Sequence, residues 1–183
     1  MWQDISRIGK KLVQSGLVES HFGNISVRMG DKMLITRSGS SLDELTSEKV
    51  VEVEVRSSCA LDVIASSETV VHRAIYNSTP AFAIVHAHCP YAVTMSLLQA
   101  EGYITPLDSE GKYFLGDIPI VHGDIGSGEL ADALAVTLSA HKAAIVHGHG
   151  TFAIGRVLEE AYVFTTQVEH SCRIKYLYDL MRK

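Results

Sequence analysis

The sequence is poor in the features that mark several large classes of protein. Its 183 residues include only three cysteines, Cys59, Cys89 and Cys172, which are far apart and odd in number. They form neither a disulfide framework nor a CxxC metal knuckle, which fits a reducing compartment. No apolar run approaches the roughly 18–20 residues that a membrane span needs. A disulfide-stapled secreted domain and a membrane-spanning protein are therefore both disfavoured.

Positive charge is also scarce. The chain has 16 Lys and Arg against 21 Asp and Glu, a net charge of −5, and no basic cluster is interleaved with aromatic residues. Nucleic-acid-binding surfaces are usually basic, so no nucleic-acid partner is expected. The N-terminal segment MWQDISRIGKK carries charges where a signal peptide needs an apolar stretch. We therefore expect a cytoplasmic protein with neither a membrane nor a nucleic acid as partner.

Apolar residues, by contrast, suffice for one well-packed domain. They make up 46% of the chain, and no linker, repeat or low-complexity tract interrupts residues 1–183, which we interpret as a single domain. Hydrophobic periodicity and turn residues predict helices at 2–17, at 43–48, after 68, and at 90–100, 129–141 and 158–182. They predict strands at 24–28, 33–36, 50–55, 81–88, 143–150 and 151–155, with only weak signals over 102–127. This alternation is typical of a layered α/β or α+β domain.

Histidine is abundant, with nine residues that are unevenly placed. His86 and His88 are two residues apart on a predicted strand, so both side chains should leave the same face. One such pair would more often be structural, but His147 and His149 repeat the spacing after the same apolar segment, AIV. Four buried imidazoles need partners, and a divalent metal ion is one. The spacing predicts a metal site and leaves open whether His147 or His149 completes it.

Turns of small polar residues offer the rest of a catalytic site. Glu68 follows Ser66-Ser67 at the start of a predicted helix, where backbone N–H groups favour an anion. Taken alone, it would be an ordinary acid of a first helical turn. Gly23-Asn24 and Ser38-Gly39 are further turns at which backbone amides can approach an oxyanion. Together with Ser66-Ser67 they are candidates for a phosphate cradle, although each is also a common turn signal.

In their order along the chain, these segments resemble the class II aldolase/adducin family. The matching motifs are GNIS (23–26), LITRSG (34–39), SSE (66–68), VHRAIY (71–76), VHAH (85–88), GELA (128–131) and GHGTFAIG (148–155). The resemblance covers residues 4–180 and is nearest to the L-fuculose-1-phosphate aldolase branch, in its short archaeal form. It implies a three-layer α/β/α fold with a central, mostly antiparallel sheet, and a homotetramer with sites at subunit interfaces.

The resemblance also implies a role for each candidate residue. His86, His88 and His149 match the family's metal ligands, His149 because it precedes the glycine of the HG motif, which leaves His147 as a structural residue. Glu68 matches the catalytic acid/base, which can also ligate the metal. The segments that hold the substrate phosphate match Gly23, Asn24, Ser38, Gly39, Ser66 and Ser67. One Zn²⁺ per subunit is implied, although Co²⁺, Mn²⁺ or Fe²⁺ would suit three histidines as well.

The activity that the resemblance implies is that of a zinc-dependent aldehyde-lyase acting on a small sugar phosphate. Such an enzyme reversibly cleaves a ketose 1-phosphate, for example L-fuculose 1-phosphate, into dihydroxyacetone phosphate and an aldehyde such as lactaldehyde. Alternatives on the same metal ligands are methylthioribulose-1-phosphate dehydratase and pentulose-phosphate epimerase, and a non-enzymatic alternative is an adducin-like scaffold. A cupin also uses HxH, but it has a glutamate a few residues later, which HCPYAV (88–93) lacks.

Three positions depart from the family pattern. Ala65 and Arg37 stand where relatives often have proline, and Arg37 offers either a contact for an anionic substrate or a plain surface charge. The tyrosine that bacterial relatives carry before the GELA segment is missing from IPIVHGDIGSGEL (118–130). His122 and Tyr113 are the candidates to replace it. The proton donor on the aldehyde side is therefore left unassigned by the sequence.

Overall fold

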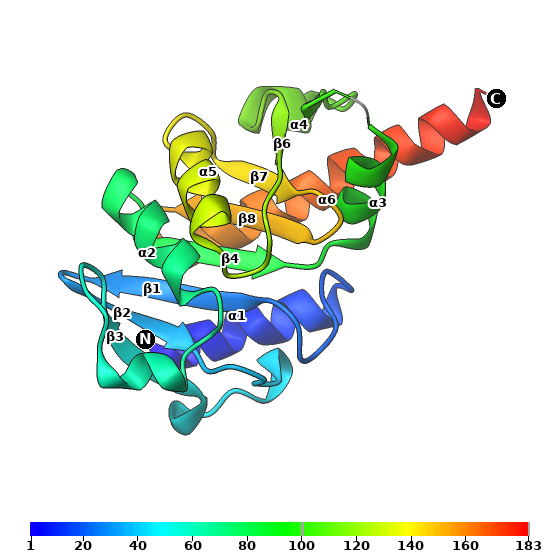
Figure 1. The fold of residues 1–183 in the computed structure, drawn as a ribbon. Coiled ribbons are helices and arrows are strands. Elements are labelled where there is room, and N and C mark those ends of the chain that lie inside the picture. Colours follow the sequence, from blue (N-terminus) through cyan, green and yellow to red (C-terminus); the bar gives the residue numbers. More distant parts are fainter. Residues whose placement is uncertain (100, 183) are drawn as a thin grey trace.

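An eight-stranded sheet forms the centre of the computed structural model, which describes residues 1–99 and 101–182 (Figure 1). Its strands are β1 (Asn24–Met29), β2 (Lys32–Thr36), β3 (Val50–Glu54), β4 (Ala83–Ala87), β5 (Tyr103–Ile104), β6 (Ile118–Val121), β7 (Ala143–Val146) and β8 (Gly150–Gly155). Their order across the sheet is β3-β2-β1-β4-β8-β7-β6-β5. The neighbours β6 and β7 are parallel and the remaining neighbours antiparallel. The central sheet that the sequence predicts is therefore present, as a mixed sheet.

Helices cover both faces of this sheet (Figure 1). They are α1 (Trp2–Gln14), α2 (Thr69–Ser78), α3 (Pro90–Leu98), α4 (Ser109–Phe114), α5 (Gly128–Leu138) and α6 (Leu158–Met181). One cluster of buried apolar side chains joins α1, α3 and α6 to one face, and a second joins α2 and α5 to the other. Burial of apolar surface on both faces supplies the main favourable free energy of folding. No helix in the described part of the chain is long and apolar enough to cross a membrane.

The two faces of β4 show how the sheet positions the site. Val85 belongs to the α1–α3–α6 cluster, whereas Ile84 belongs to the α2–α5 cluster. Side chains alternate along a strand, so His86, two residues after Ile84, points to the α2–α5 face. The paired residues on β1 are Ser26 opposite Ile84 and Asn24 opposite His86, which share that face. The start of α2 lies above the beginning of β1 and the end of β4.

Several predicted elements differ in the structure. The helix expected at 43–48 is replaced by two 3-10 turns, Leu42–Glu44 and Ser47–Lys49, because Thr46 between them is extended, with φ of −111° and ψ of 174°. The weakly patterned stretch 102–127 contains β5, α4 and β6. The helix expected over 90–100 ends at Leu98, and position 100 lies outside the described residues.

The second HxH pair is the most consequential difference. The sequence predicts one strand over 143–150, but β7 ends at Val146 and β8 begins at Gly150, with a turn between them. Gly148, at the middle of this turn, has a φ of +66°, a left-handed conformation that favours glycine. The expectation that His147 and His149 leave one face of a strand is therefore wrong. Because of this turn, the side chains of His147 and His149 have different neighbours.

Candidate active site

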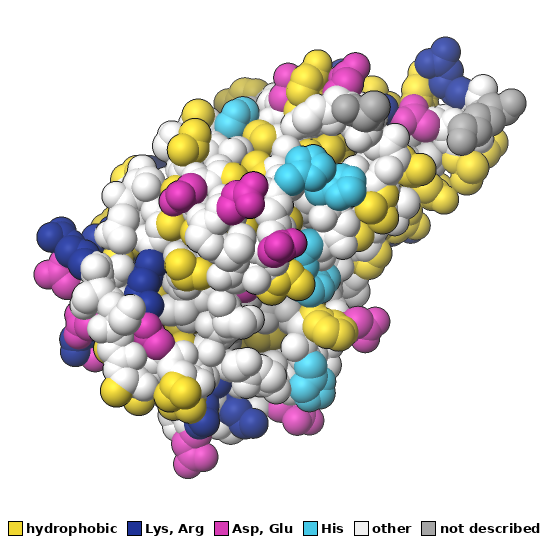
Figure 2. Space-filling view, in the orientation of Figure 1, with side chains coloured by type: hydrophobic (Ala, Val, Ile, Leu, Met, Phe, Trp, Pro, Cys, Tyr) yellow, Lys and Arg dark blue, Asp and Glu magenta, His cyan; other side chains and the backbone are white. Residues whose placement is uncertain are grey.

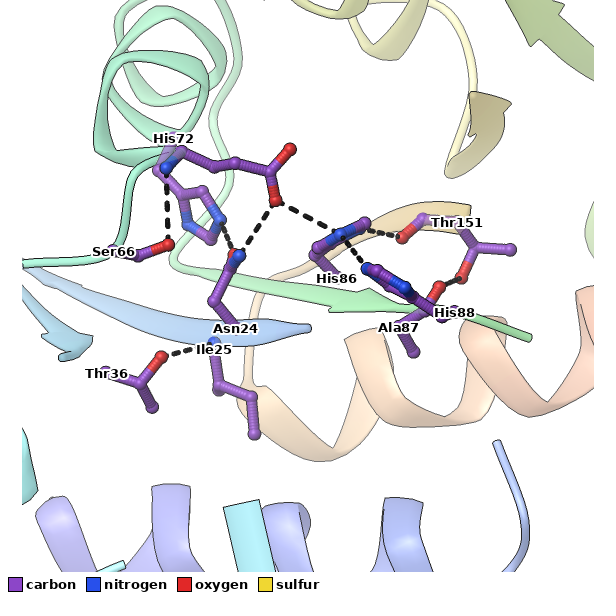
Figure 3. Close-up of polar contacts among 10 residues, drawn as sticks. Asn24, Ile25, Thr36, Ser66, His72, His86, Ala87, His88 and Thr151 are labelled. Carbon is purple, nitrogen blue, oxygen red and sulfur yellow. Dashed lines mark hydrogen bonds and ion pairs between the residues drawn. The ribbon is translucent and has the colours of Figure 1, made fainter. Parts of the chain in front are cut away.

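The first two histidines of the site come from the end of β4. His86 is fully buried, and its Nδ1–H donates to the carbonyl oxygen of Thr151 on β8, at 2.9 Å. This bond fixes the tautomer and leaves Nε2 unprotonated, as a metal ligand requires. His88 lies just beyond the strand, with its Nε2 3.1 Å from Nε2 of His86 and its ring stacked on Phe22 at 5.4 Å between centroids. Figure 3 shows the rings of His86 and His88 side by side.

The third histidine comes from the turn between β7 and β8. The ring of His149 lies 4.8 Å from the rings of both His86 and His88, centroid to centroid. One ligand nitrogen from each of the three falls within 4.8 Å of the others. His147 is exposed and stacks instead on His122, at 4.6 Å. The geometry thus groups His149, not His147, with the pair on β4.

Electrostatics suit this histidine cluster to a cation. Burial lowers the pKa of His88 to about 4, lowers that of His149, and lowers that of His86 well below its usual value, so all three rings are neutral at pH 7. Oε2 of Glu68 lies 3.1 Å from the unprotonated Nε2 of His86. This contact is not a salt bridge, because the imidazole is neutral. Lone pairs that converge in this way repel one another unless a positive charge lies between them.

Two buried atoms without partners support the same conclusion. Among the described residues, Oε1 of Glu68 and Nδ1 of His149 are buried and have no hydrogen-bond partner. An unsatisfied buried polar atom costs free energy, and a metal ion would satisfy such atoms. Three neutral imidazoles with a nearby carboxylate form a donor set that Zn²⁺ and other divalent first-row ions accept. The residues present therefore fit the implied metal.

Glu68 is placed by the entry to α2. It is the N-cap residue of that helix rather than a member of its first turn, and only 3% of its surface is exposed. Its Oε2 accepts a hydrogen bond from Nδ2–H of Asn24, at 2.9 Å. Burial raises the pKa of Glu68 to about 7, and the hydrogen bond from Asn24 opposes that rise. A carboxyl group with a pKa near neutrality can both give and take a proton, as general acid–base catalysis requires.

A polar cavity of about 240 Å³ opens beside the histidines. All six residues predicted to hold phosphate line it, together with Glu68, His88 and His149; the six are Gly23, Asn24, Ser38, Gly39, Ser66 and Ser67. No acceptor within the described chain takes the backbone N–H of Gly39 or of Ser67. Arg37 also lines the cavity and adds positive charge. The arrangement could hold an anionic group a short distance from the histidines.

The structure also places residues that the sequence could not. Ile125, from the loop before α5, lines the same cavity and is 64% exposed. Its loop packs so closely on the SSE segment that a Cβ on Gly126 would lie 2.7 Å from the carbonyl oxygen of Ser67. The two candidates for the missing tyrosine are not among the cavity's lining residues: Tyr113 is 80% exposed, and His122 stacks on His147. Figure 2 shows histidine side chains reaching the surface on this face, with acidic and apolar side chains between them.

Comparison with known proteins identifies the class to which this fold and site belong. The model of the class II aldolase and adducin N-terminal domain matches residues 3–176, and the chain belongs to that family. L-fuculose phosphate aldolase of Methanocaldococcus jannaschii is 30% identical over 179 residues, covering 97% of this chain and 96% of that protein. The crystal structure of L-fuculose-1-phosphate aldolase from Thermus thermophilus superposes with a TM-score of 0.92 and 34% identity, covering 99% and 95% of the two chains. The resemblance to the short fuculose-phosphate aldolases is thereby confirmed.

Other relatives carry names of different reactions. The 3-oxo-tetronate 4-phosphate decarboxylase of Pectobacterium atrosepticum is 27% identical over 180 residues, 95% of this chain and 83% of that protein. A probable bifunctional methylthioribose-1-phosphate isomerase/methylthioribulose-1-phosphate dehydratase of Nocardia farcinica is 36% identical over 95 residues, half of this chain but only 17% of that protein. Family membership therefore establishes a class of site, while the reaction has to be argued from the residues.

Proposed function

We propose that this protein is a metal-dependent aldolase that reversibly cleaves a ketose 1-phosphate into dihydroxyacetone phosphate and an aldehyde. L-fuculose 1-phosphate, which gives lactaldehyde, is the proposed substrate because the short relatives that cover the whole chain are named for it. The proposal depends on one arrangement: a cavity lined by His88, His149, Glu68 and the anion cradle, next to the buried His86 that completes the group of three histidines.

The phosphate would be held by the cradle. The N–H groups of Gly39 and Ser67, the hydroxyl of Ser38 and the guanidinium of Arg37 offer donors around the cavity. Backbone amides of small-residue turns are common ligands for phosphate oxygens. Binding energy from the phosphate is realised away from the reacting carbons, so it can fix the orientation of the substrate.

The reacting carbons would lie between the histidines and Glu68. His86, His88 and His149 would hold a divalent ion, whose Lewis acidity would stabilise negative charge on the substrate's oxygen atoms. In cleavage, Oε1 of Glu68 returns a proton to the carbon that the aldehyde leaves, and in synthesis the same oxygen removes it. Asn24 holds the other carboxylate oxygen, which leaves Oε1 without a hydrogen-bond partner and free for this exchange. Zn²⁺ is the proposed ion, with Co²⁺, Mn²⁺ and Fe²⁺ as substitutes.

The assembly we propose is a homotetramer with the sites at subunit interfaces. Exposed apolar side chains gather on α3 and on the projecting end of α6, where they border a groove lined by Met95, Leu98, Gln99, Tyr176, Asp179 and Leu180 (Figure 2). Exposed apolar patches commonly mark protein–protein contacts. A neighbouring subunit would also be a source for the aldehyde-side proton donor, which we do not assign within this chain.

A panel of substrates tests the reaction. The metal-loaded protein would be incubated with the 1-phosphates of fuculose, ribulose and methylthioribulose and with 3-oxo-tetronate 4-phosphate, and triose phosphate, carbon dioxide and dehydration product would be measured. We expect triose phosphate from fuculose 1-phosphate, and its loss in Glu68→Gln. Dehydration of methylthioribulose phosphate or release of carbon dioxide, without triose phosphate from any ketose, would refute the aldolase in favour of a relative's reaction. An inert protein without bound metal would favour the adducin-like scaffold.

A further inference from the structure

A chain of buried polar side chains runs from the interior of the protein to Glu68. Ser26 and Asn24 on β1 face the helix α2, which carries His72 and Tyr76. Oγ of Ser26 lies 2.8 Å from the hydroxyl of Tyr76 and 2.7 Å from Nδ1 of His72. Nε2 of His72 contacts Oδ1 of Asn24, whose Nδ2 lies 2.9 Å from Oε2 of Glu68. His72 is fully buried, and Figure 3 shows its ring next to the side-chain amide of Asn24.

When Glu68 is ionised, each hydrogen bond in this chain can run in only one direction. The ionised carboxylate of Glu68 only accepts, so Asn24 must turn its NH₂ group to it and its oxygen to His72. That oxygen needs a donor, so Nε2 of His72 carries the proton. Burial lowers the pKa of His72 to about 3, so the ring is neutral and Nδ1 is an acceptor. Ser26 therefore donates to Nδ1 and accepts from Tyr76.

This order has a consequence for Asn24. A free asparagine amide can rotate by half a turn, which would put its oxygen against the carboxylate of Glu68 and repel it. The Nε2–H of His72 stabilises the orientation in which the amide donates. An amide does not readily pass on a proton, so the chain fixes geometry and does not conduct protons from Tyr76 to Glu68.

We propose that His72 is a positioning residue of the active site, which holds Asn24 in the orientation that binds Oε2 of Glu68. The inference rests on the proposed catalytic role of Glu68. With Oε2 held in this way, the unpartnered Oε1 is the oxygen left to exchange a proton with the substrate. The network thus acts on catalysis through one amide group, without any contact between His72 and the cavity.

The first test is a measurement of the tautomer of His72, which does not require the protein to have enzymatic activity. A ¹H–¹⁵N correlation spectrum of the imidazole rings at pH 8.5, above the pKa of about 7 of Glu68, should show His72 protonated at Nε2 and bare at Nδ1, with the signal assigned by its loss in His72→Gln. His86 provides an internal reference, because its bond to Thr151 requires the opposite tautomer, protonated at Nδ1. A His72 ring protonated at Nδ1, or at both nitrogens, would overturn the proposal.

Kinetics of paired variants form the second test. His72→Phe keeps a ring in the core but removes the donor, and kcat should fall about tenfold, with KM and bound metal unchanged. His72→Gln, whose amide N–H can replace Nε2–H, should recover most of the loss. Tyr76→Phe, a buried change on the same helix at the far end of the chain, should leave the tautomer of His72 unchanged.

Coupling to Asn24 separates positioning from a general effect on folding. If His72 acts through Asn24, the double variant His72→Phe/Asn24→Ala should have the kcat of Asn24→Ala to within about twofold. Losses that multiply would contradict the proposal. If the protein cleaves no ketose phosphate, the proposed function fails while the tautomer still tests the network. If the protein is active with the other tautomer, only the present inference fails.

Discussion

At the scale of single residues, each histidine of the site is held by a different contact. A backbone carbonyl of β8 fixes the tautomer of His86, a stack on Phe22 orients His88, and a glycine turn delivers His149. None of these contacts gives the unprotonated Nε2 of His86 a positively charged partner. A cation held by the three rings would do so, and it would then contribute to the stability of the site as well as to its chemistry.

The two histidines of the β7–β8 turn give a matched pair for testing the ligand set. His149→Ala removes one of three ligands and should leave less than about one tenth of the bound zinc and of the activity, since ligand number determines affinity. His147→Ala, two residues away, removes an exposed ring that stacks on His122 and should keep both. Elemental analysis of the purified variants measures the outcome. Loss of metal in His147→Ala alone would reverse the assignment.

The buried His72 makes stability depend on pH. In the unfolded chain histidine takes up a proton near pH 6.5, whereas in the folded protein burial lowers the pKa of His72 to about 3. Between these values the unfolded state binds more protons, so the free energy of unfolding falls as pH falls, by up to about 1.4 kcal/mol per pH unit from this residue.

Urea unfolding of the metal-free protein, measured from pH 7 to pH 5 at one protein concentration, checks this slope. His72→Gln lacks the titrating ring, so its unfolding free energy should fall less steeply with acidification than that of the wild type. Two curves with the same slope would show that His72 is not the buried neutral base that the structure indicates.

At the scale of elements, the site depends on how closely β1 approaches β4. Gly23, just before β1, has a φ of +75°, and a Cβ there would lie 2.5 Å from the carbonyl oxygen of His86. Gly30, in the β1–β2 turn, has a similar φ of +65° but open space around it. The two glycines share a backbone requirement, and only Gly23 is also constrained by close packing.

Alanine at these two positions separates the two effects. Gly30→Ala should cost about 1 kcal/mol, because only the left-handed backbone opposes it. Gly23→Ala adds a steric clash and should cost roughly 2–5 kcal/mol, and it should also weaken metal binding by displacing His86. Chemical denaturation and metal titration of both variants give the comparison. Equal costs would mean that the strands can separate without harm to the site.

The helices and strands of the structure also show which parts of the fold could be predicted from the sequence. Regular periodicity predicted α1 because one apolar stripe, with buried Ile5, Ile8 and Leu12, repeats over several turns. The turn at 147–149 was not predicted, because AIVHGHG looks like a continuous strand until Gly148 adopts a positive φ. The elements within 102–127 were missed because each is at most six residues long. Grouping of the metal and cradle residues followed from the resemblance, whereas the Asn24–His72 contact depends on sheet register and helix placement.

At the scale of the whole molecule, the sheet gathers distant segments into one cavity. The cradle and the histidines come from residues between 21 and 149, joined by the neighbouring strands β1, β4 and β8 and by the start of α2. In the proposed tetramer, the surface for other subunits would lie on α3 and α6, whose exposed apolar residues include Leu98 at 66% and Leu180 at 51%.

Charge on that apolar groove should disrupt assembly. We expect a tetramer for the wild type by multi-angle light scattering, and a smaller species for Leu98→Glu, because a buried unpaired charge is costly. Val136→Glu on α5, where the side chain is 74% exposed, is the matched control and should remain a tetramer. A monomeric wild type would contradict the proposed assembly. A tetrameric Leu98→Glu would locate the interface elsewhere.

Anomalous diffraction at the zinc edge, from crystals of protein purified without chelator, would locate a metal ion at the histidine cluster. We predict one strong peak per chain, bonded to His86, His88 and His149 at about 2.0–2.1 Å from nitrogen. Glu68 should lie beside the ion. A peak bound by His147 and His122 instead, or no peak after growth with zinc, would contradict this prediction.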